Sequence, residues 1–155
     1  MALDPERQGE AALPPAMRLA RSLEIPLRLL TVVPTVETIP GDNVVAARLL
    51  PAGAAAELDL EAAASEDHLA ELAGRIAKAA GDVRVVTDVA RGDPAQVIIE
   101  RTQARPSILA LATHGRVGLD ALWSGSIGSR VIARGSGPFL LVHPEPAGAK
   151  PLGSE

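Results

Sequence analysis

The sequence predicts an α/β fold, in which helices cover both faces of a parallel sheet. Strand-length apolar runs at residues 25–33, 83–89 and 107–112 alternate with segments of helical periodicity, and a further run at Phe139–Val142 ends the pattern. Such alternation is typical of a parallel sheet. With 155 residues the chain has room for one domain of this kind.

The composition excludes several classes of protein. Hydrophobic residues make up 47% and charged residues 22%, which are ordinary proportions for a globular chain. Without cysteine there is no disulfide, thiolate metal site or cysteine nucleophile, and the three histidines (His68, His114 and His143) form no spaced ligand set. A net charge of −4 with no basic block argues against nucleic acid as the main partner.

The sequence leads us to expect neither a membrane-spanning helix nor a signal peptide. No apolar run reaches the ~18 residues of a membrane-spanning helix, and acidic residues near Met1 stand where a signal peptide is basic and then apolar. We therefore expect no membrane partner and a cytoplasmic location. Residues 1–143 form the predicted domain, and the Pro/Gly-rich tail at 144–155 is expected to be disordered.

Helix signals lie between the predicted strands. Asp4 and Pro5 resemble a helix cap followed by proline at the first position, so a helix is expected from there to about Ser22. Pro14 and Pro15 should either kink it or leave the carbonyl groups near Glu10 and Ala11 to water. A loop is expected over residues 34–56, with a short helix at 44–50, and a helix from about 57 to 80. Asp93-Pro94 predicts another capped helix start, and the last helix is expected to run through Ile127 and Val131.

The segment that follows the third apolar strand carries features of an anion-binding site. Gly115 and Gly118 allow backbone N–H groups to face one concavity, and Gly125-Ser126 opens a helix whose N-terminus favours phosphate. Arg116 adds a cation. A Walker motif is absent, because no lysine lies between Lys78 and Lys150, and neither a dinucleotide-binding glycine pattern nor a hydrolase signature is present.

This stretch resembles the C-terminal half of the universal stress protein family. The family pattern is G-x-x-G, nine residues, then G-S/T; Gly115 and Gly125-Ser126 match it, with Ala112 in place of the first glycine. The likeness extends upstream to Gly92–Ala95, to the strand at 29–33 and to Leu3-Asp4. It implies a flavodoxin-like (adenine nucleotide alpha hydrolase-like) fold, a doubly wound parallel sheet of strand order 3-2-1-4-5.

The resemblance also implies a ligand. Family members divide into ATP binders and non-binders, and in the binders the residue matching Asp4 lies beside the adenosine and the one matching Val32 contacts the adenine. The ribose and phosphates, with Mg²⁺ or Mn²⁺, would lie against the matching loop residues: Ala112, Thr113, His114, Gly115, Arg116, Gly118, Gly125, Ser126, Ile127 and Gly128.

Two functional hypotheses remain open at this point. The first is an ATP-binding regulatory module of the stress response with at most slow hydrolysis, since no general base is identifiable. The second is a dimeric interaction module of the same fold that binds no nucleotide. Asp4 fits either hypothesis, because an aspartate before proline is also an ordinary helix cap.

The first strand is expected to be truncated or missing. Only Met1-Ala2-Leu3 precedes Asp4, about 10 Å of extended chain at ~3.3 Å per residue. The neighbouring strands at 27–33 and 107–112 should then have unpaired inner edges, which is costly for buried backbone. We expect either that these strands shift together or that the natural protein begins upstream of Met1, and we favour the second explanation.

A homodimer is expected through the last strand. Phe139–Val142 is apolar and should lie at the edge of the sheet, because it follows the last helix. Bare apolar edges invite pairing, and antiparallel pairing about a two-fold axis would cover this one.

Overall fold

The structure, a computed structural model, describes residues 1–3, 8–39, 49–112 and 127–142. Its strands are β1 (Ala2–Leu3), β2 (Leu27–Val33), β3 (Val85–Arg91), β4 (Leu109–Ala112) and β5 (Phe139–Val142). Its helices are the short 3-10 helix η1 (Gln8–Ala12), α1 (Leu13–Ser22), α3 (Pro51–Ala79), α4 (Pro94–Gln103) and α6 (Ile127–Arg134). The predicted alternation of strands and helices is confirmed.

All the described strands are parallel, but they form two separate ladders. The first has the order β1-β2-β3 and the second joins β4 to β5. β2 and β3 pair over seven residues, from Leu27↔Val85 to Val33↔Arg91. β1 pairs with the middle of β2 through Ala2↔Leu30 and Leu3↔Thr31. The expected order 3-2-1-4-5 is therefore present, with a truncated first strand and a break between β1 and β4.

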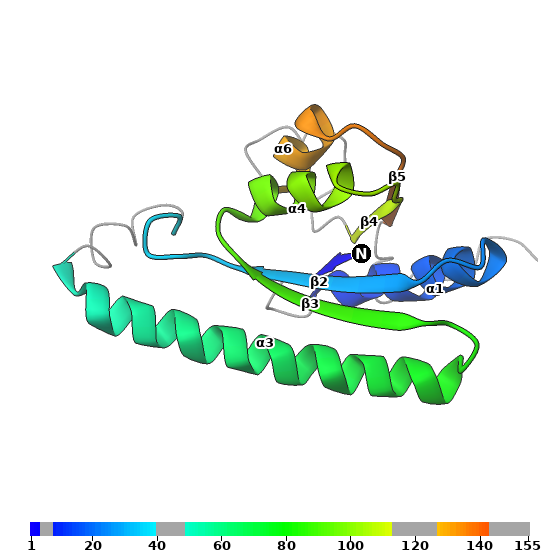
Figure 1. Ribbon diagram of the computed structural model, residues 1–155, viewed down its shortest axis with the longest axis horizontal. Coiled ribbons are helices and arrows are strands. Elements are labelled where there is room, and N and C mark those ends of the chain that lie inside the picture. Colours follow the sequence, from blue (N-terminus) through cyan, green and yellow to red (C-terminus); the bar gives the residue numbers. More distant parts are fainter. Residues whose placement is uncertain (4–7, 40–48, 113–126, 143–155) are drawn as a thin grey trace, which may run out of the picture.

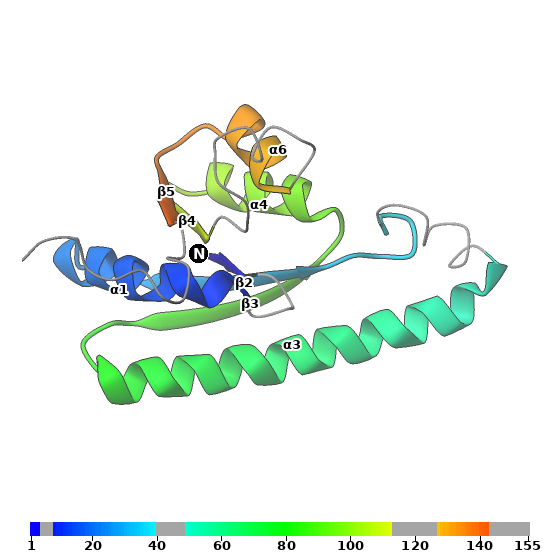
Figure 2. The same ribbon diagram turned by 180° about the vertical axis from the view of Figure 1, so that it is seen from behind.

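Helices cover both faces of the sheet, as a doubly wound fold requires. Figures 1 and 2 show α1 and α3 on one face and α4 and α6 on the other. Odd-numbered residues of β2 such as Leu29 pack with α1 and α3, whereas Leu30 and Val32 pack with α4 and Val131 of α6. The alternation of side chains along a strand thus supplies two cores from one apolar run.

Two helices begin at positions other than those predicted. α1 starts at Leu13, with proline in its first turn and η1 ahead of it, so the prolines do not kink a longer helix. Proline lacks an N–H group, which the first helical turn does not need. For the same reason α3 begins at Pro51, inside the predicted loop. The predicted cap Asp4 and most of the predicted short helix at 44–50 lie outside the described residues.

α3 is held by a long apolar stripe. Its buried residues recur at alternating steps of four and three along 29 residues: Leu58, Ala62, Ser65, Leu69, Leu72 and Ile76. Glu10 connects η1 to α3. Its carboxylate lies 2.9 Å from a guanidinium nitrogen of Arg75 and 3.3 Å from Nε2 of His68. In β4, Leu109 and Ala110 are buried, whereas Leu111 and Ala112 are partly exposed.

The amine of Met1 is buried next to β2. Met1 is 8% exposed, and its amine donates a hydrogen bond of 2.7 Å to the carbonyl oxygen of Arg28. Burial, together with the nearby charge of Arg28, lowers the pKa of this amine from 8.0 to about 6. An ammonium ion at this place therefore opposes folding.

We expect the free energy of unfolding to rise as the pH is raised from 6 to 8. In this window the unfolded amine still holds the proton that the folded amine has released, so the unfolded state binds more protons and stability increases with pH. Integrated from pH 6 to pH 8, the difference between the two pKa values corresponds to a rise of about 2 kcal/mol. Chemical denaturation at several pH values measures the rise, and Nα-acetylated protein is the control because its amine cannot titrate. Identical pH dependence in the two forms would contradict this assignment.

Candidate functional site

The carboxyl ends of the strands meet at one edge of the sheet, which is where ligands bind in open α/β folds. β2 ends at Val33, β3 at Arg91 and β4 at Ala112. The Gly92 N–H group donates a 3.1 Å hydrogen bond to the Val33 carbonyl oxygen, which joins the ends of β2 and β3. This edge is the candidate site.

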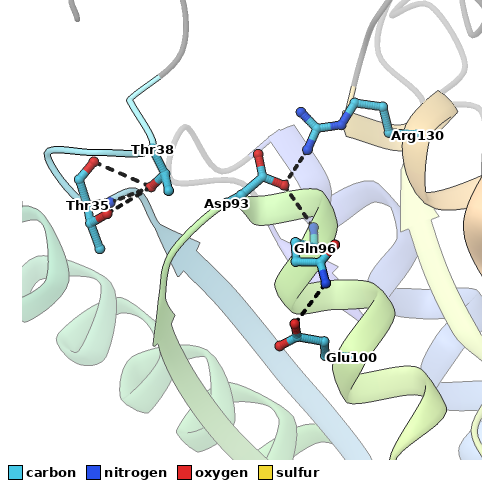
Figure 3. A network of polar contacts seen from close by, with 6 residues as sticks. All are labelled: Thr35, Thr38, Asp93, Gln96, Glu100 and Arg130. Carbon is cyan, nitrogen blue, oxygen red and sulfur yellow. Dashed lines mark hydrogen bonds and ion pairs between the residues drawn. The ribbon is translucent and has the colours of Figure 1, made fainter.

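A threonine turn follows β2 at this edge. The Thr35 N–H group donates to Oγ1 of Thr38 over 2.8 Å, and the Thr38 N–H group donates to the Thr35 carbonyl oxygen over 2.9 Å. Figure 3 shows both side chains close to the β3–α4 corner. These bonds fix the direction in which the chain leaves the sheet.

The β3–α4 corner requires glycine and then aspartate. Gly92 has φ +134°, and a Cβ there would lie 3.2 Å from Cγ2 of Val97. Asp93 caps α4, because its Oδ1 accepts a 2.8 Å hydrogen bond from the Gln96 N–H group. The Gln96 side chain in turn donates to Oε1 of Glu100 over 2.8 Å. The predicted Asp93-Pro94 helix start is confirmed.

Arg130 joins this corner to α6. Its guanidinium donates to Oδ1 of Asp93, the same oxygen that caps α4 (Figure 3). This hydrogen bond holds the pKa of Asp93 below its usual value. The first turns of α4 and α6 are thereby kept side by side at the site edge. Sequence reasoning missed Arg130, and no local pattern relates two residues that lie 37 positions apart.

The structure describes four of the predicted site residues. Val32 is 6% exposed, Ala112 and Gly128 are partly buried, and Ile127 is exposed at the start of α6. The others lie outside the described residues: Asp4, Thr113, His114, Gly115, Arg116, Gly118, Gly125 and Ser126. Ala112 ends β4 and Ile127 begins α6, so these two described elements bracket the predicted phosphate segment.

Val32 can present only its backbone to a ligand, because its side chain packs in the core with Ala90 and Ile98. Backbone groups alternate between the two edges of a strand. Since the Val33 carbonyl points to the β3 side, that of Val32 points to the opposite edge, just beyond the end of β1. A hydrogen-bond acceptor is therefore directed toward the candidate site.

The described residues contain neither a metal-binding cluster nor a membrane-spanning helix. No group of three His, Cys, Asp or Glu residues in this part of the chain is arranged to hold a metal ion. Among the helices described, none is long and apolar enough to cross a bilayer.

Comparison with protein-family models decides the family. The model of the universal stress protein family matches residues 1–143. This chain belongs to that family. No curated protein sequence matches the chain.

Solved structures show the same fold at low sequence identity. Universal stress protein UspA from Lactobacillus plantarum is 20% identical with a TM-score of 0.66, and the match covers 91% of this chain and 93% of that one. The hypothetical protein MJ0577 is 18% identical with a TM-score of 0.57, over 94% and 95% of the two chains. A universal stress protein in complex with cAMP is 18% identical with a TM-score of 0.54, over 92% and 94%. The flavodoxin-like α/β fold expected of this universal stress protein is thus confirmed.

We expect Asp93→Ala to destabilise this universal stress protein by about 1–2 kcal/mol. Loss of the helix cap accounts for about 1 kcal/mol, and the partly exposed pair with Arg130 adds less than about 1 kcal/mol. Asp93→Asn should cost less, because asparagine also caps helices. The measurement is urea denaturation at pH 7.

The matched control is Asp82→Ala. Asp82 is an exposed aspartate that pairs with Arg21 but does not cap a helix. Because the pKa of Asp93 is depressed, its stabilising effect should be complete above about pH 4 and vanish as the pH falls through the folded-state pKa. An Asp93→Ala variant as stable as Asp82→Ala would refute the role of this corner.

Proposed function

We propose that this protein is an ATP-binding regulatory module of the stress response, with the nucleotide at the carboxyl edge of the sheet. The observation that carries the proposal is the position of Ala112 and Ile127. The last residue of β4 and the first of α6 bracket a segment with the spacing Gly115, nine residues, Gly125-Ser126. A glycine-rich turn that leads into a helix N-terminus is suited to phosphate.

The adenine end of the proposed site lies beside β2. The Val32 carbonyl points toward this edge and would accept a hydrogen bond from the exocyclic amino group of adenine. The neighbouring Thr35–Thr38 turn directs the following chain along the same edge. Support also comes from a structural neighbour described in complex with cAMP, another adenine nucleotide.

The charges at this edge suit phosphate groups. Asp93 would repel them if it were free, but Arg130 offsets its charge. The positive ends of α4 and α6 lie beside each other through the same contact, and helix N-termini favour anions. Asp59 of α3, a further carboxylate described near this edge, is paired with Arg91 at the end of β3.

Binding rather than turnover is the activity that these groups support. Asp93 and Asp59 are each held by an arginine, and a hydrogen bond with Thr35 lowers the pKa of Glu37 in the threonine turn, so these carboxylates are poor general bases. A divalent ion, Mg²⁺ or Mn²⁺, would be held by the phosphates themselves. We propose at most slow hydrolysis.

We expect ATP to bind to the wild-type protein in the presence of Mg²⁺, and Gly125→Leu to weaken binding at least tenfold. A leucine side chain at the motif glycine obstructs the backbone N–H groups that would face the phosphates, and a tenfold loss corresponds to about 1.4 kcal/mol. Isothermal titration calorimetry measures both affinities. Gly74→Leu is the matched control, because Gly74 is an exposed residue of α3 and a Cβ added there would meet no atom within 4 Å.

Absence of ATP binding by the wild type would favour the alternative function, a dimeric interaction module that binds no nucleotide. Acid extraction of the purified protein provides a second readout, because a tightly bound adenine nucleotide would be released and identified by chromatography. Equal weakening by Gly125→Leu and Gly74→Leu would also contradict the site.

We propose, in addition, a homodimer through the outer edge of β5. β5 pairs with β4 on one side, and the part of the chain that the structure describes has no strand on its other side. Leu141 is 40% exposed on this apolar strand. Pairing of two copies of β5 would cover it.

We expect Leu141→Lys to convert the dimer to monomer, because a charge on an edge strand opposes pairing with a second copy. Sedimentation velocity at micromolar concentration distinguishes the two states. Leu60→Lys is the control, since Leu60 is 73% exposed on α3, away from β5. A monomeric wild type, or a Leu141→Lys variant that still dimerises, would refute this interface.

A further inference from the structure

The first half of α3 and the two residues before it carry the most exposed large apolar side chains of the described part of the chain. Leu60 is 73% exposed, and Leu49 and Leu50, directly before the helix, are 75% and 73% exposed. The other exposed large apolar residues described are at most 49% exposed. Exposed apolar side chains that gather in one region mark an interaction surface more often than singly scattered ones do.

Leu60 points away from the sheet. It lies two residues from both Leu58 and Ala62, which are buried in a core cluster with Val33 of β2. Two residues correspond to about 200° around an α-helix, so Leu60 lies on the opposite face. Figures 1 and 2 show the beginning of α3 extending past the ends of the strands. The outer face also carries small exposed residues, which with the three leucines form the outer strip of α3: Gly53, Ala56, Ala63 and Ala64.

Carboxylates frame the outer strip. Along one flank, along the other flank and beyond the C-terminal end of the strip stand, in that order, Glu57 and Glu61, Glu66, and Asp67 and Glu71. None of these five forms an ion pair with a residue that the structure describes. In α3 no lysine or arginine precedes Arg75. The outer strip is therefore surrounded by negative charge that α3 itself does not offset.

Part of this charge acts against the helix itself. Glu57 and Glu61 are four positions apart, as are Asp67 and Glu71, and like charges at this spacing destabilise a helix. A cationic partner along the strip would relieve both repulsions. Binding of a basic partner thus removes a cost that the isolated chain carries.

We propose that the outer strip binds a basic amphipathic helix of another protein, with the apolar side of that helix on the leucines and its Lys and Arg side chains against the five carboxylates. Charge complementarity favours this occupant over a second copy of the chain, because two α3 helices would bring acidic flanks together. An anionic lipid surface is disfavoured for the same reason. The inference does not depend on nucleotide binding.

The dimensions of the outer strip suit a helix. Residues 53–64 span about 16 Å, or roughly three turns, along α3 at about 1.5 Å per residue. The small side chains of Ala56 and Ala63 beside Leu60 let a second helix approach to the usual axis separation of about 8–10 Å. The partner helix would present apolar residues three and four positions apart, with basic residues on either side of them.

The test uses the full chain and a fluorescent probe peptide of about 18 residues, roughly five helical turns, with leucine and lysine at helical spacing. Fluorescence anisotropy measures the affinity. We expect binding at about 0.1 M salt and binding weaker by about tenfold or more at about 1 M, where the screening length falls from about 10 Å to about 3 Å. Two comparison peptides, one with serine in place of leucine and one with glutamate in place of lysine, should each bind more weakly by about tenfold or more.

Two variants of the protein localise the binding surface. Leu60→Ser removes the central apolar contact, and the double variant Glu57→Lys/Glu61→Lys reverses the charge of one flank. Each should weaken binding of the Leu/Lys peptide by about tenfold or more without lowering the Tm, because the changed side chains lie outside the buried core. Leu23→Ser and Glu24→Lys, at exposed positions after α1, are the matched controls and should leave the affinity unchanged.

Several results would overturn the proposal. If the Leu/Lys peptide does not bind, or if the serine peptide binds equally well, the outer strip does not seat an amphipathic helix. Equal loss of affinity in the Leu60→Ser and Leu23→Ser proteins would reveal attraction without a defined surface. A lower molar mass for Leu60→Ser than for the wild type in sedimentation velocity would show that a second copy of the chain covers the strip.

Discussion

The full-length pairing of β2 with β3 is the interaction on which the rest of this molecule depends. Seven consecutive registered pairs join the two strands, and the side chains of β2 supply one core to α1 and α3 and another to α4 and α6. A strand buried on both faces cannot leave its backbone groups to water, so its second edge also needs a partner. β1 meets this need at Leu30 and Thr31.

The candidate site depends on the same sheet in a different way. Parallel pairing brings the ends of β2 and β3 to one edge, where the Gly92 N–H group bonds to the Val33 carbonyl and Asp93 caps α4. A single carboxylate oxygen of Asp93 then serves two elements, as acceptor for the Gln96 N–H group and for Arg130. This shared oxygen places the start of α6 relative to α4 and the sheet.

Local patterns predicted the parts of the site that are encoded locally. Asp93-Pro94 is a helix start in any context, because the aspartate accepts the orphan N–H group and the proline lacks one. Val32 was predicted to contact a ligand, but only the register shows that its carbonyl, and not its buried side chain, faces the edge. The starts of α1 and α3 differ from the predicted ones because prolines 14 and 51 stand in first turns, where the missing N–H group is not needed.

The sequence by itself determined the alternation of strands and helices, the short β1 and membership of the universal stress protein family, because these depend on residue order over short windows and on a spaced glycine motif. Only the tertiary structure decided which distant groups meet. The separation of β4 from β2, the approach of Arg130 to Asp93 and the burial of the Met1 amine against Arg28 all join residues far apart along the chain. Such contacts follow from how elements pack and from which backbone edges remain to be paired, and no local pattern records either.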